Sequence, residues 1–163
     1  MHTLLLALHI LCAILFLGPV TVAVSGFGAQ AWKAQEGSDL ARGTARIFHK
    51  ITATYGVLSV LVPAIGVALM FTDPGLYWKQ GRFHASIVLS VIAWILLIVV
   101  IIPRQKRMLG ALRLLDEGEQ EEAEADGEAT VTDWASAKKQ LSIMGGIFCL
   151  LWVIIAILMF TNF

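Results

Sequence analysis

Charge is scarce in this sequence of 163 residues, and it is missing in long stretches. Only 15% of the residues are Asp, Glu, Lys or Arg, against about 25% in soluble proteins, whereas 58% are hydrophobic. Twelve basic residues balance twelve acidic ones, so the formal net charge is zero. A soluble protein this apolar and neutral would precipitate, and it lacks the basic surplus of a nucleic-acid-binding protein. The composition predicts an integral membrane protein whose first partner is the lipid bilayer.

The four stretches without charge are each long enough to cross a bilayer, which requires about 20 apolar residues. They cover residues 1–32, 51–72, 83–103 and 140–163. We predict an all-α fold, a single membrane domain over residues 1–163, with a four-helix transmembrane bundle whose spans lie at about 3–25, 51–71, 84–103 and 141–161. A signal peptide cleaved near Ala23-Val24-Ser25 is the alternative for the first span, but no Lys or Arg precedes it, which favours an uncleaved helix.

Basic residues are distributed unequally among the connecting segments. The first loop holds four, the third holds six, the second holds only Lys79 and Arg82, and the two ends of the chain hold none. Lys and Arg concentrate in cytoplasmic loops. Loops one and three are therefore predicted to lie in the cytoplasm and both termini outside. The expected localisation is the bacterial plasma membrane, as a multi-pass protein with N-out/C-out topology.

The third loop, residues 104–139, separates its charges into two blocks. Residues 104–113 hold four basic and no acidic side chains, whereas residues 116–128 hold eight acidic and no basic ones. One interpretation is a basic collar beside anionic lipid, followed by a solvated acidic linker. The other is an acidic docking element for a basic partner surface. The acidic residues assigned to that partner contact are Asp116, Glu117, Glu119, Glu121 and Glu122.

Side chains that carry chemistry are rare within the spans. No acidic or basic residue lies at membrane depth, which argues against proton pumps, ion-coupled transporters and voltage sensors. The sequence contains no glycine-rich phosphate loop, no HExxH and no CxxC motif, so we predict no catalytic residues and no enzymatic activity. Pro19 and Pro63 predict kinks in the first two spans. Because broken helices can mark transport sites, transport of a small solute remains an alternative.

Histidine and cysteine provide the candidates for a cofactor or a metal. His9 lies in the first span with Cys12 one turn later, and His84 begins the third span. Paired histidines hold haem, and soft ligands suit copper, so His9 with His84 is a candidate haem site and His9 with Cys12 a candidate copper site. A histidine hydrogen-bonded to a neighbouring helix is the simpler interpretation. His49 begins the second span at the opposite side, too far away to share a ligand.

Small residues and tryptophans within the spans predict close packing. Trp94 and Trp152 each lie about ten residues inside a span, where the indole N–H requires an acceptor. These tryptophans either pack within the bundle or contact another membrane subunit, a lipid or a quinone. Pairs of small residues four positions apart favour close helix contact. These pairs are Ala64 and Ala68, Ser86 and Ser90, and Ser142 and Gly146.

The run Leu8-His-Ile-Leu-Cys-Ala-Ile-Leu-Phe-Leu-Gly18 resembles the first helix of small bacterial four-helix membrane proteins that are largely uncharacterised. These proteins are distantly similar to the copper-resistance D type and to the membrane protoporphyrinogen oxidase type. The glycines of the second span, Gly56 and Gly66, and the four-helix layout fit the same group. The resemblance implies that His9 matches the first-helix histidine proposed there as a haem or metal ligand.

The size of the chain, its acidic loop and its lack of catalytic groups also look like those of a small accessory subunit of a respiratory assembly. The actinobacterial cytochrome bc–aa3 supercomplex has several such subunits. By this resemblance we expect a non-catalytic accessory or stabilising subunit of a larger membrane complex, with other integral membrane subunits as partners. Haem or copper handling through His9 is the alternative function, and small-solute transport is the second alternative.

Overall fold

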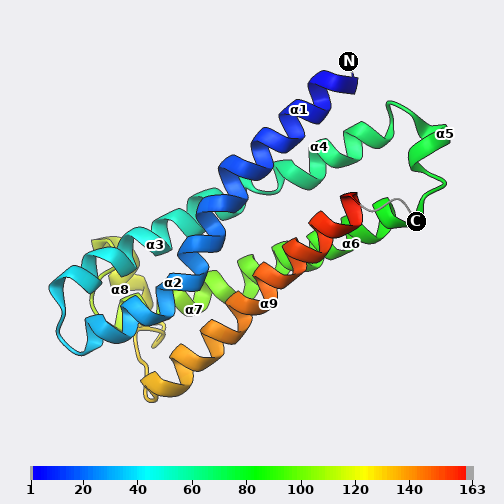
Figure 1. The fold of residues 1–163 in the computed structure, drawn as a ribbon. Helices are drawn as coiled ribbons and strands as arrows, with labels where there is room; N and C mark the ends of the chain where they lie inside the picture. The colour runs from blue at the N-terminus through cyan, green and yellow to red at the C-terminus, as the bar shows by residue number, and fades with distance from the viewer. Residues whose placement is uncertain (1, 161–163) are drawn as a thin grey trace.

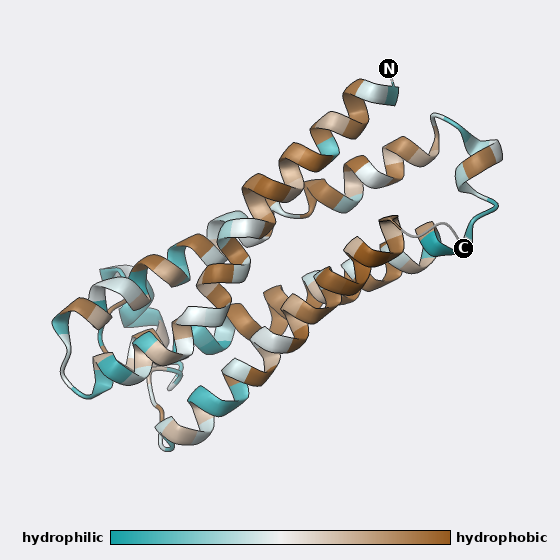
Figure 2. Ribbon diagram, viewed as in Figure 1, coloured by the Kyte–Doolittle hydropathy of each residue, from teal (hydrophilic) through white to brown (hydrophobic). Residues whose placement is uncertain are grey.

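The computed structural model describes residues 2–160, and all regular secondary structure in that range is helical (Figure 1). Four long helices are apolar enough to cross a membrane: His2–Gln35, Asp39–Met70, Gly81–Ala111 and Trp134–Phe160. Figure 2 shows apolar residues along these helices and polar residues gathered towards the ends of the bundle. The prediction of an all-α protein with four helices suited to span a membrane is confirmed.

Three of the long helices are divided by local irregularities. The first comprises α1 (His2–Cys12), a π-helical segment η1 (Ala13–Leu17) and α2 (Gly18–Gln35). The second comprises α3 (Asp39–Leu58) and α4 (Leu61–Met70), and the third comprises α6 (Gly81–Ile95), the π-helical η2 (Leu96–Ile101) and α7 (Ile102–Ala111). The fourth, α9 (Trp134–Phe160), is continuous. Two short helices, α5 (Pro74–Tyr77) and α8 (Glu117–Ala125), lie in the connecting segments.

Each irregularity lies just before a proline. Proline has no N–H to bond the carbonyl four residues earlier, and its ring crowds that carbonyl. The helix therefore widens into a π turn or breaks. Pro19 follows η1 and Pro103 follows η2, whereas before Pro63 the helix breaks after Leu58. The sequence predicted disturbances at Pro19 and Pro63, and the structure adds a third at Pro103.

At one end of the bundle the helices continue well beyond the predicted spans. A first loop was expected between residues 25 and 51, but α2 ends at Gln35 and α3 begins at Asp39. In the short turn between them Gly37 has a φ of 99°, which glycine adopts without steric cost. Ser38 then caps α3 by accepting a hydrogen bond from the Ala41 N–H. The four basic residues assigned to the first loop therefore lie on helices.

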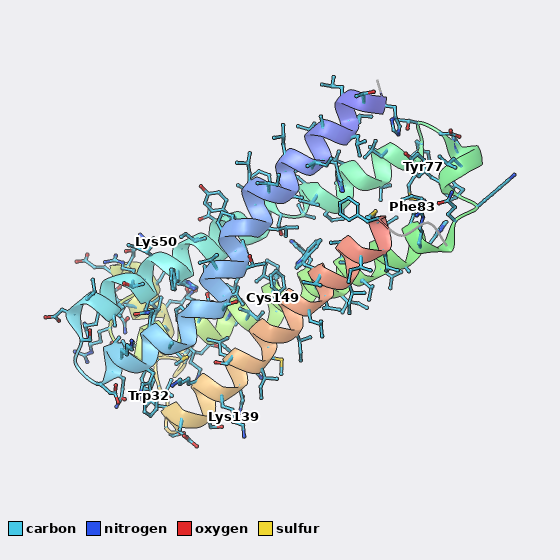
Figure 3. The ribbon with its side chains drawn as sticks, viewed as in Figure 1. Trp32, Lys50, Tyr77, Phe83, Lys139 and Cys149 are labelled. Carbon is cyan, nitrogen blue, oxygen red and sulfur yellow. The ribbon has the colours of Figure 1, made fainter. Side chains whose placement is uncertain are left out.

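The two ends of the bundle are packed differently. At the charged end, which carries Lys50 and Lys139 (Figure 3), α2 packs against α3 and α9, and α3 packs against α7. The core there includes Phe27 and Phe148, which are fully buried. Towards the hairpin end, which carries α5, α1 pairs with α4 and α6 pairs with α9 (Figure 1). No residue of α1 is buried, so this half leaves much of its apolar surface outside the bundle.

Candidate functional site

The acidic block forms a helix that folds back onto the charged end. The inner edge of α8 rests on α7, where Ala123 is buried and the Gln120 side-chain amide donates a hydrogen bond of 3.0 Å to the carbonyl of Gly110. The acidic block is therefore an ordered element of the fold. Two ion pairs join α8 to the basic block: Lys106 with Glu122 at 3.5 Å, and Arg113 with Glu124 at 3.8 Å.

The chain turns sharply between α7 and α8. Arg113 has a φ of 55°, in the left-handed region, and it occupies the position after a helix end where glycine is usual. The next residue, Leu114, donates its N–H to the carbonyl of Leu109 at 2.9 Å, as in a Schellman motif. This turn sends residues 114–116 back along α3.

Three basic residues of α3 contact either the end of α7 or this returning segment. Arg42, Arg46 and Lys50 are spaced four residues apart, so they lie on one face of the helix. Arg42 donates to the carbonyl of Leu112 at 3.0 Å. Arg46 pairs with Asp116, and the Lys50 ammonium lies 3.4 Å from the same carboxylate. The hydrogen bond from Arg46, followed by that from Lys50, holds the pKa of Asp116 below its usual range.

A groove of about 350 Å³ lies between α3 and the returning segment. One wall is the face of α3, which contributes charged and polar side chains. The other wall combines leucines with two carboxylates. The lining residues are Arg46, His49, Lys50, Ala53 and Thr54 on α3, and Leu109, Leu114, Leu115, Asp116 and Glu119 opposite.

Beside the groove, His49 and Gln105 form a buried polar pair. His49 is 9% exposed and Gln105 is fully buried, and His49 Nδ1 lies 3.2 Å from Gln105 Oε1. Within the described residues, Gln105 Nε2 has no hydrogen-bond partner. A buried donor without an acceptor costs about 1–3 kcal/mol. The sequence set His49 apart from the other histidines and gave no signal for Gln105, which stands in a basic segment and becomes significant only through its burial.

His9 lies at the contact between α1 and α4. The ring packs against Gly66, where an added Cβ would lie 3.2 Å from His9 Cε1. His9 Nδ1 is buried and has no hydrogen-bond partner in residues 2–160. Cys12 is half-buried one turn further along. The same residues contain no group of three or more His, Cys, Asp or Glu side chains placed to hold a metal ion.

His84 lies at the hairpin end among aromatic residues, in the first turn of α6. Its ring meets Trp78 edge-on, with 5.9 Å between the ring centres, and Nδ1 lies 3.5 Å from the carbonyl of Gln80. Nearby, Tyr77 on α5 packs edge-on against Phe83 (Figure 3). The contacts described for His84 are with this aromatic group, and those described for His9 are with α4.

The two mid-span tryptophans differ in their hydrogen bonding. Trp94 donates its indole N–H to the carbonyl of Gly56 at 3.2 Å, so its acceptor lies inside the bundle. Trp152 packs edge-on against Phe148, with 6.3 Å between ring centres. Its indole nitrogen is buried and finds no partner in the part of the chain that is described. Packing within the bundle accounts fully for Trp94 and leaves one donor of Trp152 unsatisfied.

The acidic residues assigned to a partner contact divide into two groups. Asp116 and Glu122 form the ion pairs described above, and Glu119 lines the groove. Glu117 and Glu121 are exposed, and neither forms an ion pair with any described residue. Glu119, which lines the groove, likewise forms no ion pair with a described residue, so Glu117 and Glu121 are the unpaired carboxylates of α8 that lie outside the groove.

The small-residue pairs are used unequally. Ser86 and Ser90 are buried on α6, whereas Ala64 and Ala68 on α4 are exposed. On α9 the glycine that packs closely against α2 is Gly145, which precedes Gly146. An added Cβ at Gly145 would lie 2.9 Å from Val24 Cγ1 on α2, but one at Gly146 would meet nothing within 4 Å.

No protein-family model, curated protein or solved structure matches this chain. Its function is therefore inferred from the geometry of its own residues.

Proposed function

We propose that this protein is a non-catalytic accessory subunit that docks onto a larger membrane complex through α8. The observation that carries the proposal is the fixed position of this acidic helix. Its inner edge is held to α7 and α3 by hydrogen bonds and ion pairs. Its outer edge presents Glu117 and Glu121, one turn apart and exposed. A partner with a basic surface fits this edge, and a respiratory complex of the cytochrome bc–aa3 type is the assembly we favour.

The energetics of α8 support an external partner. Glu117 and Glu121 stand at i and i+4, where like charges destabilise a helix by about 0.2–0.5 kcal/mol. The ion pairs on the inner edge are exposed, so water screens them and they contribute little net stability. A basic partner surface would remove the repulsion on the outer edge and complete the neutralisation of the helix.

The apolar half of the molecule supports lateral packing within the bilayer. No residue of α1 is buried, and Ala64 and Ala68 on its partner helix α4 are exposed. Small residues allow the backbones of two membrane helices to approach closely. In the proposed arrangement the charged end lies in the cytoplasm, since it carries ten of the twelve basic residues.

Affinity purification from native membranes in a mild detergent tests the proposal. The wild-type chain should recover other integral membrane subunits in fixed stoichiometry, and the double variant Glu117→Lys/Glu121→Lys should lose them. The double variant Glu36→Lys/Asp39→Lys reverses the same amount of charge in the turn between α2 and α3, and it should retain the partners. Recovery of the lone protein in several detergents, or partners retained by the α8 variant, would contradict the proposal.

His9 supports a second candidate function, the handling of haem or copper. Its Nδ1 is buried and unpaired in the described part of the chain, and a free imidazole nitrogen is the atom that binds either group. The same purification measures it, through a Soret band and the copper content. His9→Ala should abolish either signal, His84→Ala should affect only haem, and Cys12→Ser only copper. A colourless, copper-free protein from a host supplied with both would exclude this function.

A further inference from the structure

The groove beside α3 brings two cations to one anion. Arg46 and Lys50 both reach the carboxylate of Asp116. The facing wall combines three leucine side chains with the carboxylates of Asp116 and Glu119. Arg and Lys bind phosphate oxygens as they bind carboxylate oxygens. We propose that this groove binds the phosphate group of an anionic phospholipid, which replaces the carboxylate of Asp116 on Arg46 and Lys50.

The groove lies where its helices leave the apolar region. Lys50 is the last charged residue before the uncharged run 51–72, and Arg104 is the first after the run 83–103. Lipid headgroups occupy this boundary in a bilayer. The volume of about 350 Å³ is within the range of about 300–1,000 Å³ that small-ligand sites occupy. The leucine wall suits the beginning of the acyl chains, and the α3 wall suits the headgroup.

The buried pair beside the groove is a second indication of a ligand. Gln105 Nε2 is fully buried with no acceptor in the described residues, and the hydrogen bond of Gln105 is to His49, which lines the groove. Gln105 does not itself line the groove, so in this proposal a water molecule held between Gln105 and a headgroup oxygen supplies the missing acceptor. An empty groove leaves this donor unsatisfied.

The carboxylate of Asp116 competes with the lipid phosphate for Arg46 and Lys50. Arg46, Lys50 and Asp116 are each about half exposed, so a lipid phosphate can reach the cations. Asp116 directly precedes α8, and its displacement would loosen the start of that helix. In this arrangement the acidic and the basic residues have opposite effects on lipid affinity, which distinguishes the groove from a simple basic surface patch. Removal of the acid should strengthen lipid binding, and removal of the cations should weaken it.

Native mass spectrometry of the full chain in detergent, titrated with phosphatidylglycerol, tests the site. The wild-type protein should retain one molecule of this lipid more tightly than zwitterionic phosphatidylcholine. Arg46→Gln/Lys50→Gln should lower the affinity about 30-fold, because each of the two basic residues near the membrane surface contributes attraction to anionic lipid. Asp116→Asn should raise the affinity several-fold.

Two control variants match these charge changes elsewhere. Lys33→Gln/Lys139→Gln removes two exposed cations from the charged end, and Asp126→Asn removes one acid from the end of α8; both should leave the affinity unchanged. Thermal unfolding verifies that each variant is folded. If Arg46→Gln/Lys50→Gln does not fold, the single variant Lys50→Gln is used in its place. Equal binding of both lipids, equal losses in the two lysine-containing double variants, or no gain in Asp116→Asn would overturn the proposal. Displacement of the lipid by millimolar inorganic phosphate would show a site for soluble anions and would also overturn it.

Discussion

At the scale of single residues, helix contacts in this bundle depend on positions where a methyl group has no room. At Gly56 an added Cβ would lie 2.8 Å from Leu97 Cδ2, and the carbonyl of the same glycine accepts the Trp94 indole. At Gly145 an added Cβ would lie 2.9 Å from Val24 Cγ1 and 3.4 Å from the Val24 carbonyl oxygen. Leu97 Cδ2 is the far end of a flexible side chain and can rotate away, whereas Val24 Cγ1 is attached directly to a β-branched carbon whose χ1 is restricted in a helix. Gly145 is therefore the stricter position.

Alanine at Gly145 should separate α9 from α2. We expect Gly145→Ala to lower the free energy of unfolding by about 1–3 kcal/mol, the usual cost of overpacking a core. Gly146→Ala places the same methyl group where nothing lies within 4 Å, and it should change stability by about 0.5 kcal/mol or less. Denaturant unfolding in detergent micelles measures both. Equal effects of the two variants would show that Gly145 does not face α2 more closely than Gly146 does.

Arg113 shows how far a single residue can depart from its sequence signal. Its left-handed backbone is the turn that places Asp116 beside α3. Glycine or asparagine would have marked such a turn in the sequence, whereas an arginine inside a basic block indicates a helix that continues. The return of the chain, and with it the groove, could not be predicted from residue types.

At the scale of elements, α8 is held to the bundle mainly by charge. Ala123 is its one buried residue, so apolar packing contributes little to its position. Its anchors are the pairs with Lys106 and Arg113, the Gln120 amide on Gly110, and Asp116 on α3. An element held in this way should respond to pH and salt more than the spans do.

Low pH should detach the start of α8 from α3. The Arg46 hydrogen bond and Lys50 lower the pKa of Asp116, so its contribution is complete above the usual carboxyl range near pH 4 and disappears as the pH falls through the lowered pKa. We expect hydrogen-exchange protection of residues 117–125, corrected for intrinsic rates, to decline over this interval more in the wild type than in Asp116→Asn. The other carboxylates titrate in both proteins, so their effect cancels. Parallel profiles would show that Asp116 does not anchor the helix.

At the scale of the whole molecule, the bundle has one highly charged end and one nearly uncharged end. Ten of the twelve basic residues and all acidic residues except Asp73 belong to the charged end. Basic loops remain on the cytoplasmic side during insertion. This asymmetry supports the N-out/C-out topology proposed above.

Cysteine labelling in intact cells tests that topology. In a background with Cys12 and Cys149 replaced by alanine, Trp78→Cys at the hairpin end should react with a membrane-impermeant maleimide. Lys139→Cys at the charged end should react only after the cells are opened. Both wild-type side chains are exposed in the structure, so access depends on the side of the membrane. The reverse pattern would show an inverted protein.

The sequence predicts the membrane part of this fold well and the charged end poorly. Runs of about 20 uncharged, apolar residues have few alternatives to a membrane helix, so all four long helices could be located. The extension of α3 carries Arg42 and Arg46, whose partners lie 70 residues away, and the extension of α2 packs against α3. The local sequence pattern contains neither contact. Whether Gly145 or Gly146 contacts α2 depends on the rotation of α9 about its axis, which the sequence does not specify to within one residue. His9 and Trp94 could be selected from residue type and depth, but Gln105 could not.

The distance along the chain between Arg46 and Asp116 also has a consequence in time. These partners are 70 residues apart, so at about 5–20 residues per second the ribosome needs roughly 4–14 seconds to make the second after the first. During that interval the cations of α3 stand without the acid that later pairs with them. The first two helices thus enter the membrane as a hairpin with four basic residues against Glu36 and Asp39, a net charge of +2. The acidic block of residues 116–128 is synthesised after the orientation of that hairpin has been set.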